Sequence, residues 1–101
     1  MSILEVAQVD VLAGHEVDFE ADLLQAAATV LPRAAGFIEF TAHGWGVERP
    51  SCYLFSIRWE TLEDHLDGFR AGELFADWRA LIGPHFAAPP VVEHFAHGEQ
   101  G

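Results

Sequence analysis

Six histidines in a chain of 101 residues raise the question of a metal site. Zinc accepts imidazole ligands, and two histidines of one helix commonly bind it from positions four apart. His94 and His97 are three apart in a predicted strand, so they point to opposite faces. His65 lies in a predicted helix and His43 in another predicted strand. Because no HxxxH or HxH pair occurs, a site would need ligands from distant segments, and the pattern favours scattered histidines without a metal.

A group of aromatic residues could wall a pocket between a sheet and its helices. Large apolar pockets with few polar groups suit flat, ring-containing ligands. The few polar members here would be His65 and Arg79. His65 stands on the apolar face of its predicted helix, between Leu62 and Phe69, where an imidazole needs a hydrogen-bond partner or a function. The alternative, that the aromatic residues only build the core, stays open. The predicted wall consists of Phe37, Tyr53, Phe55, Trp59, Phe69, Phe75 and Trp78.

Other chemistries receive less support from the residues. Cys52 begins a predicted strand directly after a turn, without the helix N-terminus that activates a thiol, so we interpret it as a structural residue. The GxSxG motif of many serine hydrolases is absent. No GxGxxG or GxxxxGK[ST] pattern occurs, so a nucleotide cofactor is not expected. Acidic residues are so common that nothing distinguishes one carboxylate pair from another.

Hydrophobic periodicity predicts the elements that must position these residues. Alternation predicts strands, apolar residues three and four apart predict helices, and glycines and prolines mark the breaks. The resulting order, β-α-β-β-α-α-β, is that of a split βαβ, ferredoxin-like α+β domain with a four-stranded antiparallel sheet. We expect one domain over residues 1–97 and a frayed tail at 98–101. The predicted strands span 3–12, 36–45, 52–60 and 91–97, and the predicted helices span 16–30, 61–72 and 73–83.

Alternation also assigns side chains to the two faces of the predicted sheet. The first strand carries Ile3, Ala7, Val9 and Val11 on one face and a mixture of apolar and polar residues on the other. The second strand places Phe37, Glu39, Thr41, His43 and Trp45 on one face. The third strand alternates the row Tyr53, Phe55, Ile57 and Trp59 with smaller and polar residues. Which row faces away from the helices depends on the register of the strands.

Composition excludes several partners. Five basic residues, all arginine, and sixteen acidic residues give a net charge of −11 with histidine neutral. Nucleic acids and anionic membranes attract clustered cations, so neither is an expected partner. With 50% hydrophobic residues, a sheet of this size leaves apolar surface that a homodimer would cover. A single cysteine, the absence of a basic, apolar leader and the absence of a long apolar run predict a cytoplasmic chain.

The segment YLFSIRWETLEDHLDGFRAGELFADWRALIGPHFAAPPVVEHF (Tyr53 to Phe95) resembles the antibiotic biosynthesis monooxygenase domain family. The marks are a strand ending in Trp59, a helix bearing His65, the FRAGELFADWRALI pattern and the closing strand PPVVEHF. The opening LEVAQVDVLAGHEVDFE also resembles the first strand and helix of that family. The resemblance implies a dimeric α+β barrel. Members of the family include cofactor-independent oxygenases of phenols and quinols, haem-degrading enzymes and proteins without known activity.

For this chain, the resemblance implies oxidation of an electron-rich phenol, quinol or polyketide-like aromatic by dioxygen without a cofactor. Such chemistry needs a base in a mostly dry pocket, a donor for the developing oxyanion and aromatic walls. His65 would be the base and Arg79 or Trp59 the donor. The aromatic residues named above would bind the small aromatic ligand. This interpretation requires His65 to line a cavity.

Two alternatives follow from the same resemblance. Haem degradation is not expected, because the haem-degrading branch uses an asparagine and this chain contains none. The position that corresponds to the haem-ligand histidine of that branch falls near Arg79, which does not ligate iron. The other alternative is a non-catalytic dimeric protein of the same fold that binds a small molecule or serves as an accessory subunit.

Overall fold

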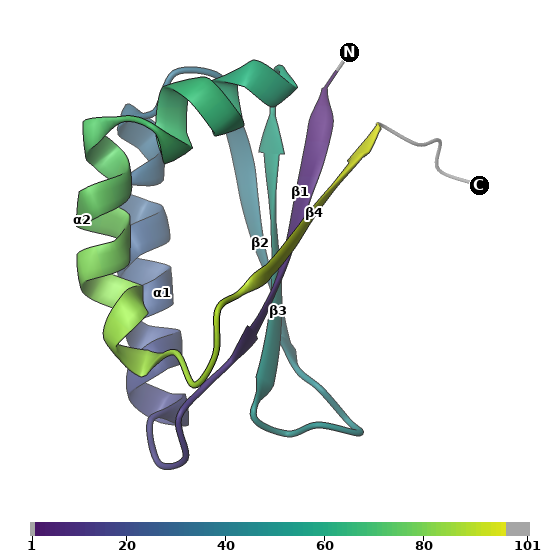
Figure 1. The fold of residues 1–101 in the computed structure, drawn as a ribbon, viewed down its shortest axis with the longest axis vertical. Coiled ribbons are helices and arrows are strands. Elements are labelled where there is room, and N and C mark those ends of the chain that lie inside the picture. The colour runs from purple at the N-terminus through teal and green to yellow at the C-terminus, as the bar shows by residue number, and fades with distance from the viewer. Residues whose placement is uncertain (1, 97–101) are drawn as a thin grey trace.

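The computed structural model describes residues 2–96, and the predicted tail at 98–101 and His97 lie outside them. Four strands form one antiparallel sheet in the order β2-β3-β1-β4. Figure 1 shows α1 and α2 on one face of this sheet, with the other face bare. The predicted ferredoxin-like α+β architecture is confirmed. The elements are β1 (Ile3–Asp10), α1 (Glu16–Thr29), η1 (Leu31–Arg33), β2 (Phe37–Trp45), β3 (Cys52–Trp59), η2 (Asp64–Arg70), α2 (Glu73–Ile82), η3 (Gly83–His85) and β4 (Val91–Ala96).

The two long helices form where the local sequence favours them. Acidic residues Glu16 and Asp18 occupy the first turn of α1, where they complement the partial positive charge of the helix N-terminus. Pro32 follows α1 within η1, and a proline disfavours helical conformation in the residue before it. The buried faces of α1 and α2 pack on β1 and β3, and this places the core between one sheet face and one helix layer.

The segment after β3 differs from its prediction. In place of an α-helix over 61–72, a π-helix, η2, occupies Asp64–Arg70. The hydroxyl of Thr61 accepts a hydrogen bond from the backbone N–H of Asp64 at 3.1 Å, as a capping residue does. Gly68 weakens the preference for a regular α-helix. The buried rings of His65 and Phe69 both pack on Trp59, with ring centroids 5.4 Å from it in each case. This packing accompanies the wider turn of the π-helix η2. Such π-helical turns are often found at functional sites.

The predicted face assignment for the second strand is wrong at both of its ends. The β2–β3 register shifts between Phe37 and Glu39, and again between Ala42 and Gly44. The two shifts move Phe37 and Trp45 to the helix side, where the Trp45 ring lies 4.8 Å from that of Tyr53. The second shift ends at a glycine with φ of +121°, a conformation that other residues rarely adopt. Because each bulge inserts one residue, simple alternation fails across it.

The register also settles which side of the sheet is uncovered. The row Tyr53, Phe55, Ile57 and Trp59 faces the helices and is buried. The uncovered face, called the open face below, carries the opposite row of every strand. The open face is lined by Leu4, Val6, Gln8, Glu39, Thr41, His43, Leu54, Ser56, Arg58, Val91, Glu93 and Phe95.

No helix within residues 2–96 is long and apolar enough to span a membrane.

Candidate active site

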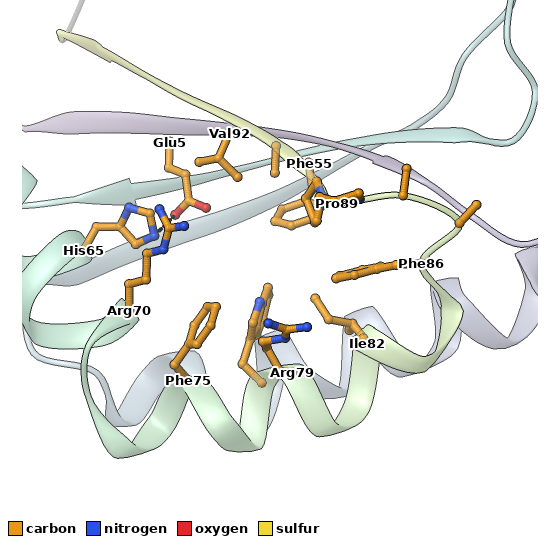
Figure 2. A pocket seen from close by; sticks show the side chains of 16 residues that line it. Glu5, Phe55, His65, Arg70, Phe75, Arg79, Ile82, Phe86, Pro89 and Val92 are labelled. Atoms are coloured by element: carbon orange, nitrogen blue, oxygen red, sulfur yellow. Dashed lines mark ion pairs between the residues drawn. The ribbon is translucent and has the colours of Figure 1, made fainter.

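A pocket of about 590 Å³ lies between the sheet and α2. Figure 2 shows strands above it and α2 below, with the segment after α2 closing the end where Phe86 lies. Its walls combine aromatic and aliphatic side chains with a small number of charged groups, the composition of a small-molecule site. The charged and polar members are Glu5, His65, Arg70 and Arg79.

Five of the residues predicted from the sequence line this pocket. His65 and Arg79 are its predicted polar members, and Phe55, Phe75 and Trp78 contribute aromatic surface. Phe55 comes from β3, whereas Phe75 and Trp78 come from the first and second turns of α2. The rings of Phe55 and Trp78 meet edge to face, with centroids 5.9 Å apart. A flat ligand would therefore contact one wall from the sheet and one from the helix.

The other four aromatic residues are not among those that line the pocket. Tyr53 lies in the core between Phe19 and Trp45, and burial raises the pKa of its hydroxyl to about 12. Phe37 packs edge to face on Trp59, with ring centroids 6.2 Å apart. These residues support the fold of the sheet rather than the pocket wall.

Phe69 and Trp59 form a second layer behind the pocket wall. The Phe69 ring lies 5.7 Å from that of Phe75 and 6.0 Å from that of Trp78, and so it supports both from behind. Trp59 has no exposed surface. Its contribution to the site is made through its indole N–H.

Glu5, which the sequence analysis did not single out, is the acidic group of the pocket. It is 6% exposed and is the one acidic residue that is buried within residues 2–96. Glu5 has the same parity on β1 as Ile3, Ala7 and Val9, so its side chain enters the apolar face of the sheet. A carboxylate at the centre of an otherwise apolar strand face was the signal that could have identified it.

A chain of close polar contacts starts at Glu5. The indole N–H of Trp59 donates to Glu5 Oε1 at 2.9 Å, and His65 Nε2 lies 3.2 Å from the same oxygen, as the dashed line in Figure 2 marks. The other ring nitrogen of His65, Nδ1, lies 2.7 Å from Nε2 of His94 on β4. The rings of Trp59 and His65 stack with centroids 5.4 Å apart. His65 is thereby oriented by contacts on both nitrogens and on one ring face.

Burial determines which member of this chain holds a proton. Burial raises the pKa of Glu5 to about 7, against the smaller opposing effects of the Trp59 hydrogen bond and the Arg70 charge. Burial also lowers the pKa of His65 to about 4, with the charges of His94 and Arg70 acting in the same direction. Burial and the charge of Arg70 lower the pKa of His94 as well. Near neutral pH, Glu5 is therefore the group that exchanges a proton, while His65 stays neutral.

The arrangement can take a proton from a ligand and pass it outward. A neutral His65 that accepts a hydrogen bond from protonated Glu5 at Nε2 carries its own hydrogen on Nδ1, which faces His94. A proton can thus move from Glu5 through His65 to His94, which is half-buried on the edge strand β4. Within residues 2–96, no three histidine, cysteine or acidic side chains are arranged to hold a metal ion.

Comparisons with known proteins agree on one family. Residues 2–81 match the family model described as antibiotic biosynthesis monooxygenase. The uncharacterised protein YczJ of Bacillus subtilis (strain 168) is 34% identical over 93 residues, which cover 92% of this chain and 96% of that protein. A structure from Bordetella bronchiseptica that is named for the same family is 36% identical, with a TM-score of 0.90, and covers 97% of this chain and 98% of its own.

A more distant likeness concerns the fold only. SnoaB, a cofactor-independent oxygenase from Streptomyces nogalater, shares 16% identity with this chain at a TM-score of 0.78. The match covers 98% of this chain and 95% of SnoaB.

Proposed function

Since the chain belongs to the antibiotic biosynthesis monooxygenase family, we propose that it is a cofactor-independent monooxygenase that oxidises an electron-rich phenol, quinol or polyketide-like aromatic with dioxygen. The observation that carries the proposal is the buried carboxyl of Glu5, which faces an aromatic-walled pocket and titrates near neutral pH. The activity of SnoaB, which has the same fold, lends further support.

Activation of the substrate begins with loss of its phenolic proton to Glu5. A general base is most effective when its pKa lies near the working pH, and the pKa of Glu5 is about 7. The pKa of His65 lies near 4, so His65 stays neutral, and we assign to it the orientation of Glu5, which holds the proton until the O–O bond breaks. Trp59 already donates its N–H to Glu5, so it positions the carboxyl, whereas the charge of Arg70 favours the phenolate at this end of the pocket.

The phenolate then reduces dioxygen directly. It transfers electrons to dioxygen and a ring carbon forms a bond to one oxygen atom, which gives a ring-bound peroxide. The proton that the ring carbon loses moves to the outer oxygen of the peroxide, the bond from the ring carbon to the inner oxygen becomes a carbonyl, and the O–O bond breaks to release hydroxide. The proton held by Glu5 converts that hydroxide to water and restores the carboxylate. In sum, one phenol and one dioxygen give one quinone and one water.

The first test follows the oxygen atoms. With a panel of substituted hydroquinones under ¹⁸O₂, we expect the protein to insert one labelled atom into the product and to accelerate oxygen uptake above the buffer rate. Autoxidation to the parent quinone leaves the product unlabelled, so mass spectrometry separates the two reactions. If the protein accelerates insertion of labelled oxygen into no member of the panel, even where a phenol binds, the proposal is contradicted. That result would favour a non-catalytic binding protein of this fold.

A variant of His65 tests its assignment as a positioning group. The His65→Ala variant is expected to lower the rate of labelled insertion about 10- to 100-fold, the effect of losing one hydrogen bond to a charged group. The matched control is His15→Ala, since His15 lies at the start of α1, away from the open face, and contacts His85 rather than the pocket. Equal rates for wild type and His65→Ala would remove His65 from the mechanism.

We also propose that the active protein is a homodimer whose open faces pack on each other in the cytoplasm. Val91 and Phe95 on β4 are 57% and 50% exposed on the open face, and neighbouring exposed apolar side chains are typical of an interaction surface. The free thiol of Cys52 is consistent with a reducing compartment. Sedimentation velocity at micromolar concentration should show a dimer for wild type and a monomer for Leu54→Glu on the open face. The control Val17→Glu, at an 81% exposed position on α1, should stay dimeric, and a monomeric wild type would refute the proposal.

A further inference from the structure

We infer that the aromatic substrate carries a carboxylate and that Arg79 binds this carboxylate while the phenolic hydroxyl faces Glu5. The inference rests on the proposed function, because it names the substrate class of the same pocket. It assigns Arg79 to substrate selection in place of the oxyanion-donor role expected from the sequence.

The five arginines differ in their side-chain partners. Three of the five form ion pairs with carboxylates, each at 3.4 Å: Arg33 with Asp77, Arg49 with Asp10, and Arg58 with Glu39. Within residues 2–96, the side chains of Arg70 and Arg79 form neither an ion pair nor a hydrogen bond, and both line the pocket. In a chain with sixteen acidic residues and a net charge of −11, the two arginines without an ion pair among the described residues thus lie at one pocket.

Arg70 and Arg79 have different roles in the pocket. The charge of Arg70 acts on Glu5, His65 and His94, whose pKa values it lowers, so Arg70 belongs to the end of the pocket where the proton moves. Arg79 comes from the last turn of α2, and Figure 2 shows it between Phe75 and Ile82. Its guanidinium is therefore available to a group that the ligand brings.

A carboxylate on the ligand is the group that fits the guanidinium of Arg79. A guanidinium presents two parallel N–H donors that match the two oxygens of a carboxylate. Arg79 is exposed, so a carboxylate that binds there keeps part of its hydration while the ring enters the apolar space beside Phe75 and Trp78. The strongly acidic surface repels anions in general. A positive charge at the entrance of this pocket therefore favours a ligand that carries a carboxylate.

The experiment compares acids with their methyl esters in the absence of turnover. The probes are 4-hydroxybenzoate, 4-hydroxyphenylacetate and 3-(4-hydroxyphenyl)propanoate, each paired with its methyl ester, so that both charge and reach vary. Binding is measured without oxygen by isothermal titration calorimetry. For wild type we expect at least one acid to bind about 10- to 100-fold more tightly than its ester, as for a charge-assisted hydrogen bond.

The variant Arg79→Gln should lose this preference and keep the affinity for the ester, whereas Arg79→Lys should keep part of the preference. The control Arg33→Gln removes the same charge from an exposed ion pair and should leave the preference intact. The inference is overturned if no pair shows a preference in wild type, whether both members bind equally or neither binds. It is also overturned if Arg79→Gln retains the preference. Because no turnover occurs, these outcomes are independent of whether labelled oxygen is inserted.

Discussion

The Glu5→Gln variant is expected to retain the fold and to insert labelled oxygen about 10²- to 10⁴-fold more slowly than wild type, the usual contribution of a general base. Glutamine matches the size of glutamate and its amide oxygen still accepts the N–H of Trp59, so the loss is confined to proton transfer. The matched control is Glu63→Gln, an exposed residue that directly precedes η2. A Glu5→Gln variant with the rate of wild type would exclude Glu5 as the base.

The pH dependence of the rate gives the same assignment a second test. The carboxylate form of Glu5 accepts the proton, so kcat/KM of wild type should rise with pH and level off above its pKa of about 7. Ionisation of the substrate also increases with pH, and the residual rate of Glu5→Gln measures that effect by itself. The ratio of the two profiles should therefore show one ionisation near pH 7, and a ratio that is constant from pH 5 to 9 would contradict the assignment.

The second large effect concerns stability, because folding transfers a proton between two residues. The pKa of Glu5 rises from 4.5 to about 7 on folding, so its stabilising contribution is complete below pH 4.5 and is lost as the pH rises through 7. The pKa of His65 falls from 6.5 to about 4, so its contribution is complete above pH 6.5 and is lost as the pH falls through 4. Between pH 4.5 and 6.5, Glu5 and His65 together hold one proton in the folded and in the unfolded state. The proton is on His65 in the unfolded chain and on Glu5 in the folded chain.

The free energy of unfolding should show this compensation when one partner is removed. From pH 4.5 to 6.5, Glu5→Gln should gain stability relative to wild type with rising pH, with a slope of up to about 1.4 kcal/mol per pH unit. His65→Gln should lose stability relative to wild type over the same range, with a similar slope of opposite sign. Urea denaturation at pH 4.5, 5.5 and 6.5 measures both. The double variant serves as the control and should run parallel to wild type, whereas parallel curves for all four proteins would rule out the proton exchange.

The fold was predictable because its determinants are local. Alternating residues in β1 and β3, apolar residues three and four apart in α1 and α2, and the breaks between them are read from neighbouring positions. Their order leaves few antiparallel arrangements, and the ferredoxin-like one is confirmed. The irregular parts were not predictable in this way. The bulges in β2 and the π-helix η2 depend on how side chains pack across the sheet, which neighbouring residues do not encode.

The site was predictable in part. An imidazole on the apolar face of a helix indicated His65, and aromatic periodicity indicated Phe55, Phe75 and Trp78, all of which line the pocket. The same aromatic pattern also indicated Tyr53, which lies in the core, because periodicity identifies a face but not the position along it. The chain of contacts from Glu5 to His94 joins the two ends of the polypeptide and has no local signature.

Composition and periodicity are enough to identify a small acidic α+β domain of one family, with a histidine and a set of aromatic residues on buried faces. The group that exchanges a proton is identified by the packing of the folded chain. Residue type places the pKa of a glutamate well below that of a histidine, and burial reverses the order for Glu5 and His65. Burial is a property of the assembled layers, because it depends on what the sheet, η2 and α2 exclude from water together.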